Sequence, residues 1–180
     1  QTGWPSSPLQ SQQQGISTVY QEVNLCPNLT VAENIFFRDF DFTSGRAQFW
    51  LDGSRMLEQA GHLVGEYKVK TASLQSPIAS LSGGNVQRAV LARELTGDVD
   101  LLIITNPCFG LDFSAVAEIR ARIMAARNAG AAVLLISEDL DEILQLSDRI
   151  LVMSDGHIAY ETPAANADIG EIGRHMAGHH

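Results

Sequence analysis

Three short runs of β-branched and apolar residues, separated by segments with helical spacing, are the feature that most limits how this chain folds. The runs cover residues 15–20, 101–104 and 131–136. Between the last two, residues 114–128 place apolar side chains on one helical stripe. Strands that alternate with helices predict a largely parallel sheet with helices packed on it. Because such sheets are covered on both sides, we expect the second and third runs to be buried on both faces.

Local signals predict the elements around this sheet. Thr30 is followed three residues later by Glu33, the pattern of a capping box at the start of a helix. A second helix is predicted over about residues 46–63, after a loop at 39–45. Another helix follows the turn at residues 82–84.

The C-terminal part of the sequence is predicted to form a short helix, a hairpin and a last helix. Leu140, Ile143 and Leu144 share one helical face. Two β-branched and apolar segments then flank Asp155-Gly156, a pair typical of tight hairpin turns. A final helix is predicted after Pro163.

Composition excludes several classes of protein. With 180 residues, 45% of them hydrophobic, the chain buries one core, so one main domain is expected. A net charge of −9 argues against binding to nucleic acid or to an anionic membrane surface. No apolar run approaches the length of a membrane span, which predicts no insertion into a membrane. Two cysteines without metal-ligand spacing fit a reducing cytoplasm.

Three parts are predicted along the chain. Residues 1–14 are rich in Gln, Ser and Pro and are predicted to be a flexible arm or linker. Residues 15–163 form the predicted domain. Residues 164–180 are predicted to be a C-terminal tail.

One turn carries the chemistry that the sequence suggests. Ser82, Gly83 and Gly84 open an amphipathic segment. Such a turn presents backbone N–H groups and a hydroxyl at a helix N-terminus, an arrangement that suits an anion such as a phosphate. Ser-Gly-Gly is also common in ordinary loops. The three residues alone do not distinguish an anion-binding turn from such a loop.

In context, residues 81–87 (LSGGNVQ) resemble the signature motif of the ATP-binding cassette (ABC) ATPases. Other segments resemble parts of that family in the same order: the glutamine segment of sugar importers, the Walker B strand, the loop that crosses between paired domains, and the switch segment, at residues 16–34, 101–107, 110–112 and 134–139. The resemblance covers about residues 15–161. It implies an α/β fold, an incomplete P-loop NTPase-like three-layer domain with a mainly parallel sheet and a helical subdomain over about residues 28–97.

The resemblance also implies site residues. In the family, the residue matching Gln21 reaches a magnesium ion and the attacking water. The signature motif meets ATP, which here implicates Ser82, Gly83, Gly84, Asn85 and Gln87. Asp112 matches the loop at the interface between paired domains, and it fits equally well as the N-cap of the helix that follows.

Three positions depart from the family pattern. Thr105 and Asn106 stand where the family has a magnesium-binding Asp and a catalytic Glu, and Glu138 stands where it has a His. A neutral hydroxyl holds a divalent cation less well than a carboxylate, and an amide is not a general base at pH 7. No G-x-x-x-x-G-K-[ST] occurs, and the two lysines, Lys68 and Lys70, lie in no glycine-rich turn. No residue is therefore assigned as catalytic.

The implied function is that of an ATP-binding subunit, or a fragment of one, of a sugar-type or nucleoside-type ABC importer. It would supply the signature motif to an ATP molecule bound between this chain and a second ABC domain, with ATP and Mg²⁺ as cofactors. The implied further partner is a membrane permease, and the implied location is cytoplasmic, at the inner face of the membrane. An N-terminally truncated cassette and a rearranged reading frame both fit the missing loop. The alternative is an inactive interaction or oligomerisation module. A serine hydrolase is disfavoured, because the sequence contains no G-x-S-x-G motif.

Overall fold

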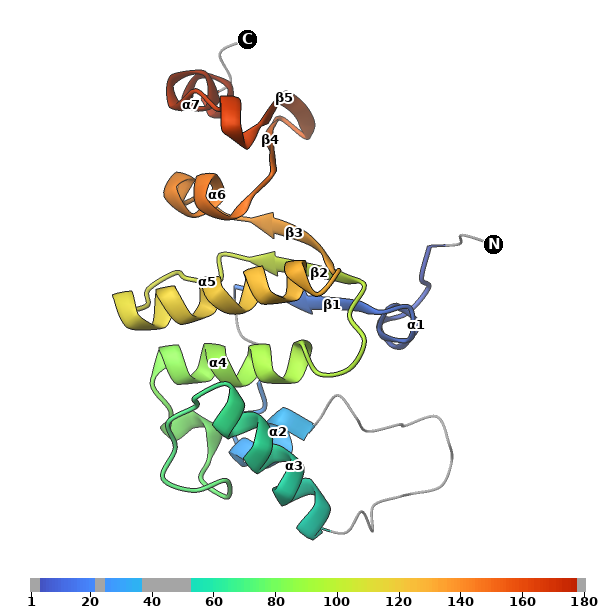
Figure 1. Cartoon of the computed structure of the whole chain (residues 1–180). Helices are drawn as coiled ribbons and strands as arrows, with labels where there is room; N and C mark the ends of the chain where they lie inside the picture. The colour runs from blue at the N-terminus through green and yellow to red at the C-terminus, as the bar shows by residue number, and fades with distance from the viewer. Residues whose placement is uncertain (1–3, 22–24, 37–52, 178–180) are drawn as a thin grey trace. The chain divides into compact units, whose positions relative to one another are not determined.

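A computed structural model describes residues 4–21, 25–36 and 53–177. The chain forms two compact units, Gln1–Leu134 and Leu135–His180. The arm, domain and tail predicted from composition divide the chain at other places, and that division stays a prediction. Figure 1 shows the order of the helices and strands.

The first unit begins with a helix where the sequence predicts a linker. This helix, α1 (Pro8–Gln13), has Pro8 near its start, where a missing N–H costs little. The Oγ of Ser7 accepts a hydrogen bond from the backbone N–H of Gln10 at 3.2 Å. The helix buries none of its residues, so no apolar stripe indicated it. The flexible arm or linker over residues 1–14 stays a prediction.

After strand β1 (Ile16–Val19) come two helices, α2 (Val31–Phe36) and α3 (Gly53–Glu66), and the short 3-10 helix η2 (Ile78–Ser80). The predicted capping box is confirmed. The backbone N–H of Glu33 donates to the Oγ1 of Thr30 at 3.2 Å, and the N–H of Thr30 donates to the Glu33 carboxylate at 2.8 Å. The predicted helix over 46–63 is confirmed from Gly53 on; its earlier part and the loop predicted at 39–45 lie outside the described residues.

Replacement of Thr30 by Ala is expected to destabilise the first unit by about 1 kcal/mol at pH 7, because the Oγ1 acceptor of the cap is lost. The hydrogen bonds from the Thr30 backbone and hydroxyl lower the pKa of Glu33. A lowered folded-state pKa contributes stability above the unfolded pKa and loses it as the pH falls through the folded value. Urea unfolding should therefore show a smaller effect of Thr30→Ala at pH 3 than at pH 7. An equal loss at both pH values would show that the hydrogen bond from the Thr30 hydroxyl to Glu33 gains nothing from the carboxylate charge, and Glu33→Gln is the matched variant without this titration.

The sheet of the first unit has the order β1-β2-β3, with β2 at Leu101–Thr105 and β3 at Ala132–Ile136. Strand β1 pairs with β2 in parallel, with Ile16 opposite Leu101. The backbone N–H of Ala132 donates to the carbonyl of Asp100 at 2.8 Å and continues the ladder to β3. The prediction of strands at these three runs is confirmed.

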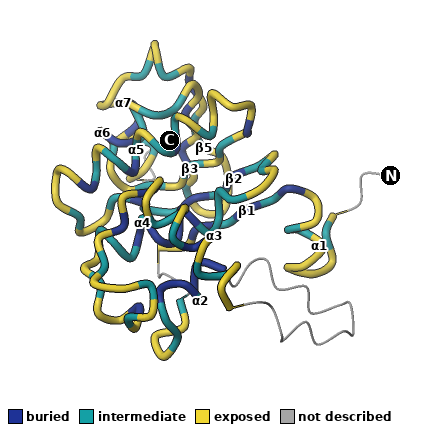
Figure 2. Tube along the Cα trace, turned by 60° about the horizontal axis from the view of Figure 1, so that its bottom comes forward, coloured by how far each residue is buried: buried dark blue, intermediate teal, exposed yellow. Residues whose placement is uncertain are grey.

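Two helices build the core beside this sheet. Helix α4 (Gly83–Glu94) contacts β1 and α5 (Phe113–Asn128). Their inward residues are fully buried together with alternate residues of the sheet: Val19, Leu91, Leu102, Ile104, Ile119 and Ile123. Figure 2 draws the buried segments of the chain in dark blue.

The prediction that β2 and β3 are buried on both faces is wrong. In β2, Leu102 and Ile104 are buried, whereas Leu101, Ile103 and Thr105 are only partly covered. In β3, Leu134 is 47% exposed and Ile136 is 50% exposed. A continuous apolar run does not reveal which face is covered, because that depends on the elements packed there.

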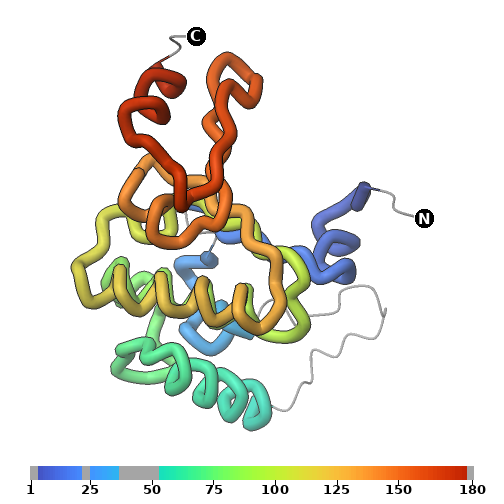
Figure 3. The backbone as a smooth tube through the Cα atoms, turned by 45° about the horizontal axis from the view of Figure 1, so that its top comes forward, coloured from blue at the N-terminus to red at the C-terminus, as the bar shows by residue number. Residues whose placement is uncertain are grey.

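The second unit contains α6 (Leu140–Leu146), the hairpin of β4 (Arg149–Ser154) and β5 (His157–Pro163), the 3-10 helix η3 (Ala164–Asn166) and α7 (Ile169–Met176). Figure 3 shows α7 in red near the hairpin, and α7 contacts β4 and β5. Ile150, Val152 and Ile172 form its core. The predicted short helix, hairpin and final helix are confirmed.

The hairpin turn has the backbone that its sequence requires. Asp155 and Gly156 have φ angles of 50° and 79°. Two successive left-handed residues are the pattern of a two-residue hairpin turn, which Asp-Gly adopts readily. The hairpin therefore follows from its own sequence.

Candidate functional site

The predicted signature turn forms the N-terminus of α4. Ser82 is the N-cap residue, with an extended backbone, and the helix begins at Gly83. The N–H groups of Asn85 and Val86 both donate to the Ser82 carbonyl at 2.9 Å. The N–H groups of Gly83 and Gly84 precede these first helical bonds and have no carbonyl partner within the helix. No acidic residue stands in the first turn, so this end keeps its positive dipole and suits an anion.

Asn85 joins the turn to a neighbouring loop. Its Nδ2 donates to the Oγ of Ser82 at 2.9 Å. Its Oδ1 accepts from the backbone N–H of Lys70 at 2.8 Å and from Arg88 at 3.4 Å. Asn85 therefore orders the turn from within the chain, and a direct contact of its side chain with a nucleotide stays a prediction.

The two glycines of the turn differ in their surroundings. A Cβ on Gly84 would lie 3.0 Å from the Cβ of Ala115, so the absence of a side chain at Gly84 allows α4 and α5 to approach closely. A Cβ on Gly83 would meet only Leu111, at the ordinary distance of 3.8 Å. Packing thus explains Gly84, whereas Gly83 has room for a side chain. Gln87 is buried, so the surrounding residues shield it from a ligand.

Asp112 caps α5, as one of the two predicted roles required. Its Oδ1 accepts from the backbone N–H of Ala115 at 2.9 Å. Sequence reasoning missed two aromatic residues that precede and follow Asp112 in the sequence. They are Phe109 and Phe113, whose side chains are 74% and 96% exposed. They lie outside any helical or strand periodicity of the core, so only their exposure draws attention to them. A place for Asp112 at a domain interface stays a prediction.

Gln21 and Asn106 are brought together at the ends of neighbouring strands. The Nδ2 of Asn106 donates to the Oε1 of Gln21 at 2.8 Å. Asn106 directly follows β2 and has a left-handed backbone, with φ at 44°. Thr105, the last residue of β2, is partly buried beside it. Parallel strands end at the same edge of a sheet, which is why residues far apart in sequence meet here.

Glu138 lies in the second unit, after β3. It is exposed, and its neighbours organise the turn. The Oγ of Ser137 donates to Glu142 at 2.7 Å, and Asp139 caps α6 through the N–H groups of Asp141 and Glu142. No catalytic role is apparent for Glu138 in this turn.

The oxygen atoms at Gln21, Thr105 and Asn106 are a poor match for Mg²⁺. All three side chains are neutral, and magnesium in proteins is held by one or two carboxylates together with phosphates and water. In the part of the chain that the structure describes, no three His, Cys, Asp or Glu side chains gather at one place. The chemistry of this donor set does not fit the metal that the resemblance implies.

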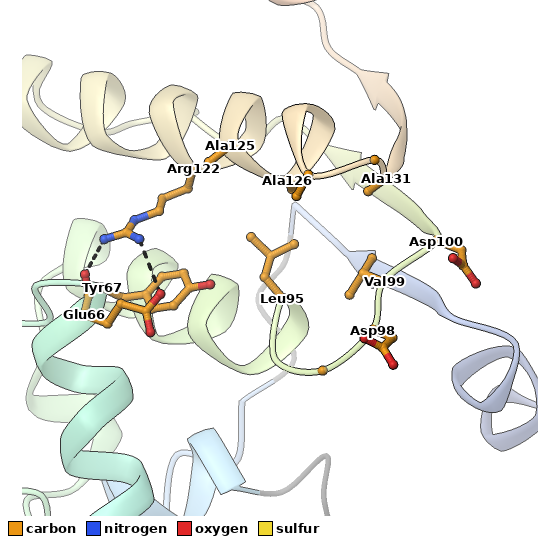
Figure 4. Close-up of a pocket in the computed structure, with 13 residues that line it drawn as sticks. Glu66, Tyr67, Leu95, Asp98, Val99, Asp100, Arg122, Ala125, Ala126 and Ala131 are labelled. Carbon is orange, nitrogen blue, oxygen red and sulfur yellow. Dashed lines mark hydrogen bonds and ion pairs between the residues drawn. The ribbon is translucent and has the colours of Figure 1, made fainter.

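A separate cavity of about 650 Å³ opens between α5, the loop after α4 and the end of α3 (Figure 4). It shares no residue with the predicted nucleotide site. At one end the guanidinium of Arg122 stacks over the Tyr67 ring at 4.4 Å and pairs with Glu66 at 3.8 Å. Burial raises the pKa of Tyr67, and a hydrogen bond from Lys68 lowers that of Glu118, which also pairs with Arg122 at 3.5 Å. Asp98 and Asp100 lie at the other end.

None of the helices that the structure describes combines the length and the apolar character needed to cross a membrane.

Comparison with known proteins gives the family. The ABC transporter family matches residues 2–108, more than half of the chain. A glucose import ATP-binding protein of Haloferax volcanii is 38% identical over 169 residues, which cover 91% of this chain and 31% of that protein. A nucleoside import ATP-binding protein of Lactococcus lactis is 40% identical over 150 residues, covering 83% of this chain and 30% of its own. The chain belongs to the ABC transporter family.

Solved structures agree on the fold. The dimeric structure of an ATP-binding cassette in a post-hydrolysis state with ADP and Pi has a TM-score of 0.68 at 22% identity, covering 83% of this chain and 62% of that one. Another ABC transporter cassette reaches a TM-score of 0.71 at 20% identity, covering 96% and 68%. The predicted α/β ABC ATPase fold is confirmed. The chain spans about a third of the length of the curated relatives it matches.

Proposed function

We propose that this chain acts in an importer of sugars or nucleosides by supplying its signature turn to an ATP molecule held by a second ABC domain. The observation that carries the proposal is the N-terminus of α4, where the Gly83 and Gly84 N–H groups precede the first helical hydrogen bonds and no acidic side chain intervenes. The likeness to import ATP-binding proteins of sugars and nucleosides supports it.

Within this role the predicted residues divide into two groups. Ser82 and Gly83 face the nucleotide, while Gly84, Asn85 and Gln87 shape the turn. Asp112, with its exposed aromatic neighbours, belongs to the face that meets the second domain. Gln21 lies elsewhere, after the C-terminal end of β1. A membrane permease is the further partner, which places the chain at the cytoplasmic side of the membrane.

The chain assists hydrolysis in this proposal and does not perform it. Asn106 stands where a general base is needed, and its amide does not accept a proton at neutral pH.

The test is sedimentation of the chain mixed with the glucose import relative of Haloferax volcanii, with and without ATP. We expect the mixed complex to form only with ATP, because the nucleotide phosphates bridge the two surfaces. Absence of ATP-dependent pairing would contradict the proposal. Pairing of equal strength without ATP would favour the second candidate.

That second candidate is an interaction or oligomerisation module without nucleotide. Large apolar side chains are exposed on the first unit, with Leu134 of the edge strand at 47% and Phe113 at 96%. Unpaired strand edges and apolar patches favour association with another chain. Such association would not depend on ATP, so the same sedimentation experiment separates the two functions.

A further inference from the structure

A side-chain hydrogen bond joins the ends of β1 and β2 across 85 positions of the sequence. Asn106 donates to the Oε1 of Gln21 at 2.8 Å. The left-handed backbone of Asn106, which Asn tolerates better than most residues, aims its amide from the end of β2. The contact thereby holds the exposed Gln21 in place.

This contact occupies the one atom by which Gln21 could bind a cation. A side-chain amide has a single oxygen acceptor and an NH₂ group with two donors, and hard cations such as Mg²⁺ take oxygen ligands. Because the Oε1 of Gln21 already accepts the Asn106 N–H, a cation at this oxygen would stand beside that positively polarised hydrogen, and the Gln21 NH₂ group offers only donors. An N–H donor attracts an anion and repels a cation.

The side chains that share this site do not restore the affinity for a metal. The hydroxyl of Thr105 and the amide of Asn106 are neutral, and the described residues hold no cluster of three His, Cys, Asp or Glu side chains. A cation would have to share the Gln21 oxygen with the Asn106 N–H or displace it, and would gain no carboxylate from these three side chains in exchange. The hydrogen bond and the neutral oxygen donors therefore both disfavour a divalent cation at this site.

We propose that the Gln21–Asn106 hydrogen bond closes the magnesium position of this site, so that the end of the sheet does not hold a divalent cation. The inference does not rest on the proposed function, which places the nucleotide at the signature turn. Its metal part is a property of the chain alone and is measured without nucleotide or partner.

The experiment measures binding of Mn²⁺, a paramagnetic substitute for Mg²⁺, to the full chain by electron paramagnetic resonance. Asn106→Asp removes the donated N–H, releases the Gln21 oxygen and adds a carboxylate, while Asp keeps the tolerance for the left-handed backbone. Gln21→Glu lets one oxygen accept from Asn106 and offers the second to the metal. We expect each variant to bind Mn²⁺ at least about tenfold more tightly than the unaltered chain.

Asn166→Asp is the matched control, because it adds the same charge at an exposed position in the second unit. It should leave Mn²⁺ binding unchanged. The proposal is overturned if the unaltered chain binds Mn²⁺ as tightly as Asn106→Asp, or if Asn166→Asp gains as much as the two site variants. Two variants on different strand ends keep the test decisive when one of them folds poorly.

Discussion

Gly83→Asp is expected to weaken ATP-dependent pairing with a second ABC domain by a hundredfold or more while leaving the free chain folded. The position is the first residue of α4, and a Cβ there meets only Leu111 at 3.8 Å. The added carboxylate would stand before the N–H groups that the proposal assigns to a phosphate. Two like charges about 4 Å apart repel by about 4 kcal/mol at an effective dielectric constant near 20.

The same substitution should act in the opposite sense on the chain alone. An acidic side chain in the first turn of a helix stabilises it by about 0.3–1 kcal/mol through the helix dipole. Thermal unfolding of the free variant should therefore occur at an equal or slightly higher temperature. This opposite sign separates loss of a ligand site from loss of the fold.

Gly53→Asp is the matched control for this prediction. Gly53 is the first residue of α3, with open space around its Cβ position and no acidic residue in the first turn. Its substitution makes the same change in charge at the same place in a helix, away from the signature turn. Sedimentation with ATP should show that Gly53→Asp pairs like the unaltered chain. If both variants lose pairing equally, net charge explains the effect and the role of the turn is refuted.

Leu102→Ala is expected to destabilise the first unit by about 2–5 kcal/mol. Leu102 lies in the central strand β2 and its side chain is fully buried. Removal of a buried isobutyl group loses its transfer free energy and leaves a cavity in the core. Small domains have only about 5–15 kcal/mol of stability, so urea unfolding should shift strongly.

Leu134→Ala tests the same residue type in the neighbouring strand. Leu134 is 47% exposed, so its truncation should cost less than about 1.5 kcal/mol, roughly half the value of a fully buried leucine. A loss as large as that of Leu102→Ala would mean that the outer face of β3 is covered in solution.

Much of the local structure is determined by short stretches of sequence. The Thr30–Glu33 capping box, the Asp155-Gly156 turn and the helix start at Gly83 form as predicted, because each depends on residues within one or two turns of chain. The order of motifs likewise predicts the ABC family. α1 is the exception, since a capped polar helix that buries nothing leaves no apolar pattern.

The candidate site was predicted as a set of residues but not as an arrangement. The sequence identifies Gln21, Asn85 and Asn106, yet their partners lie elsewhere along the chain. Asn85 accepts from the backbone of Lys70, 15 positions away, and Gln21 accepts from Asn106, 85 positions away. Such pairings depend on strand order and helix packing, which spacing along the chain does not encode.

The sequence by itself determined the elements, the family and the neutral side chains of Thr105 and Asn106, where the family pattern has two carboxylates. Only the tertiary structure decided that β3 leaves Leu134 half exposed, that Gly84 serves the packing of α4 on α5, and that Gln21 has its oxygen engaged. The physical reason is that apolar patterns and caps are local, whereas burial and hydrogen-bond partners depend on which elements the fold brings together.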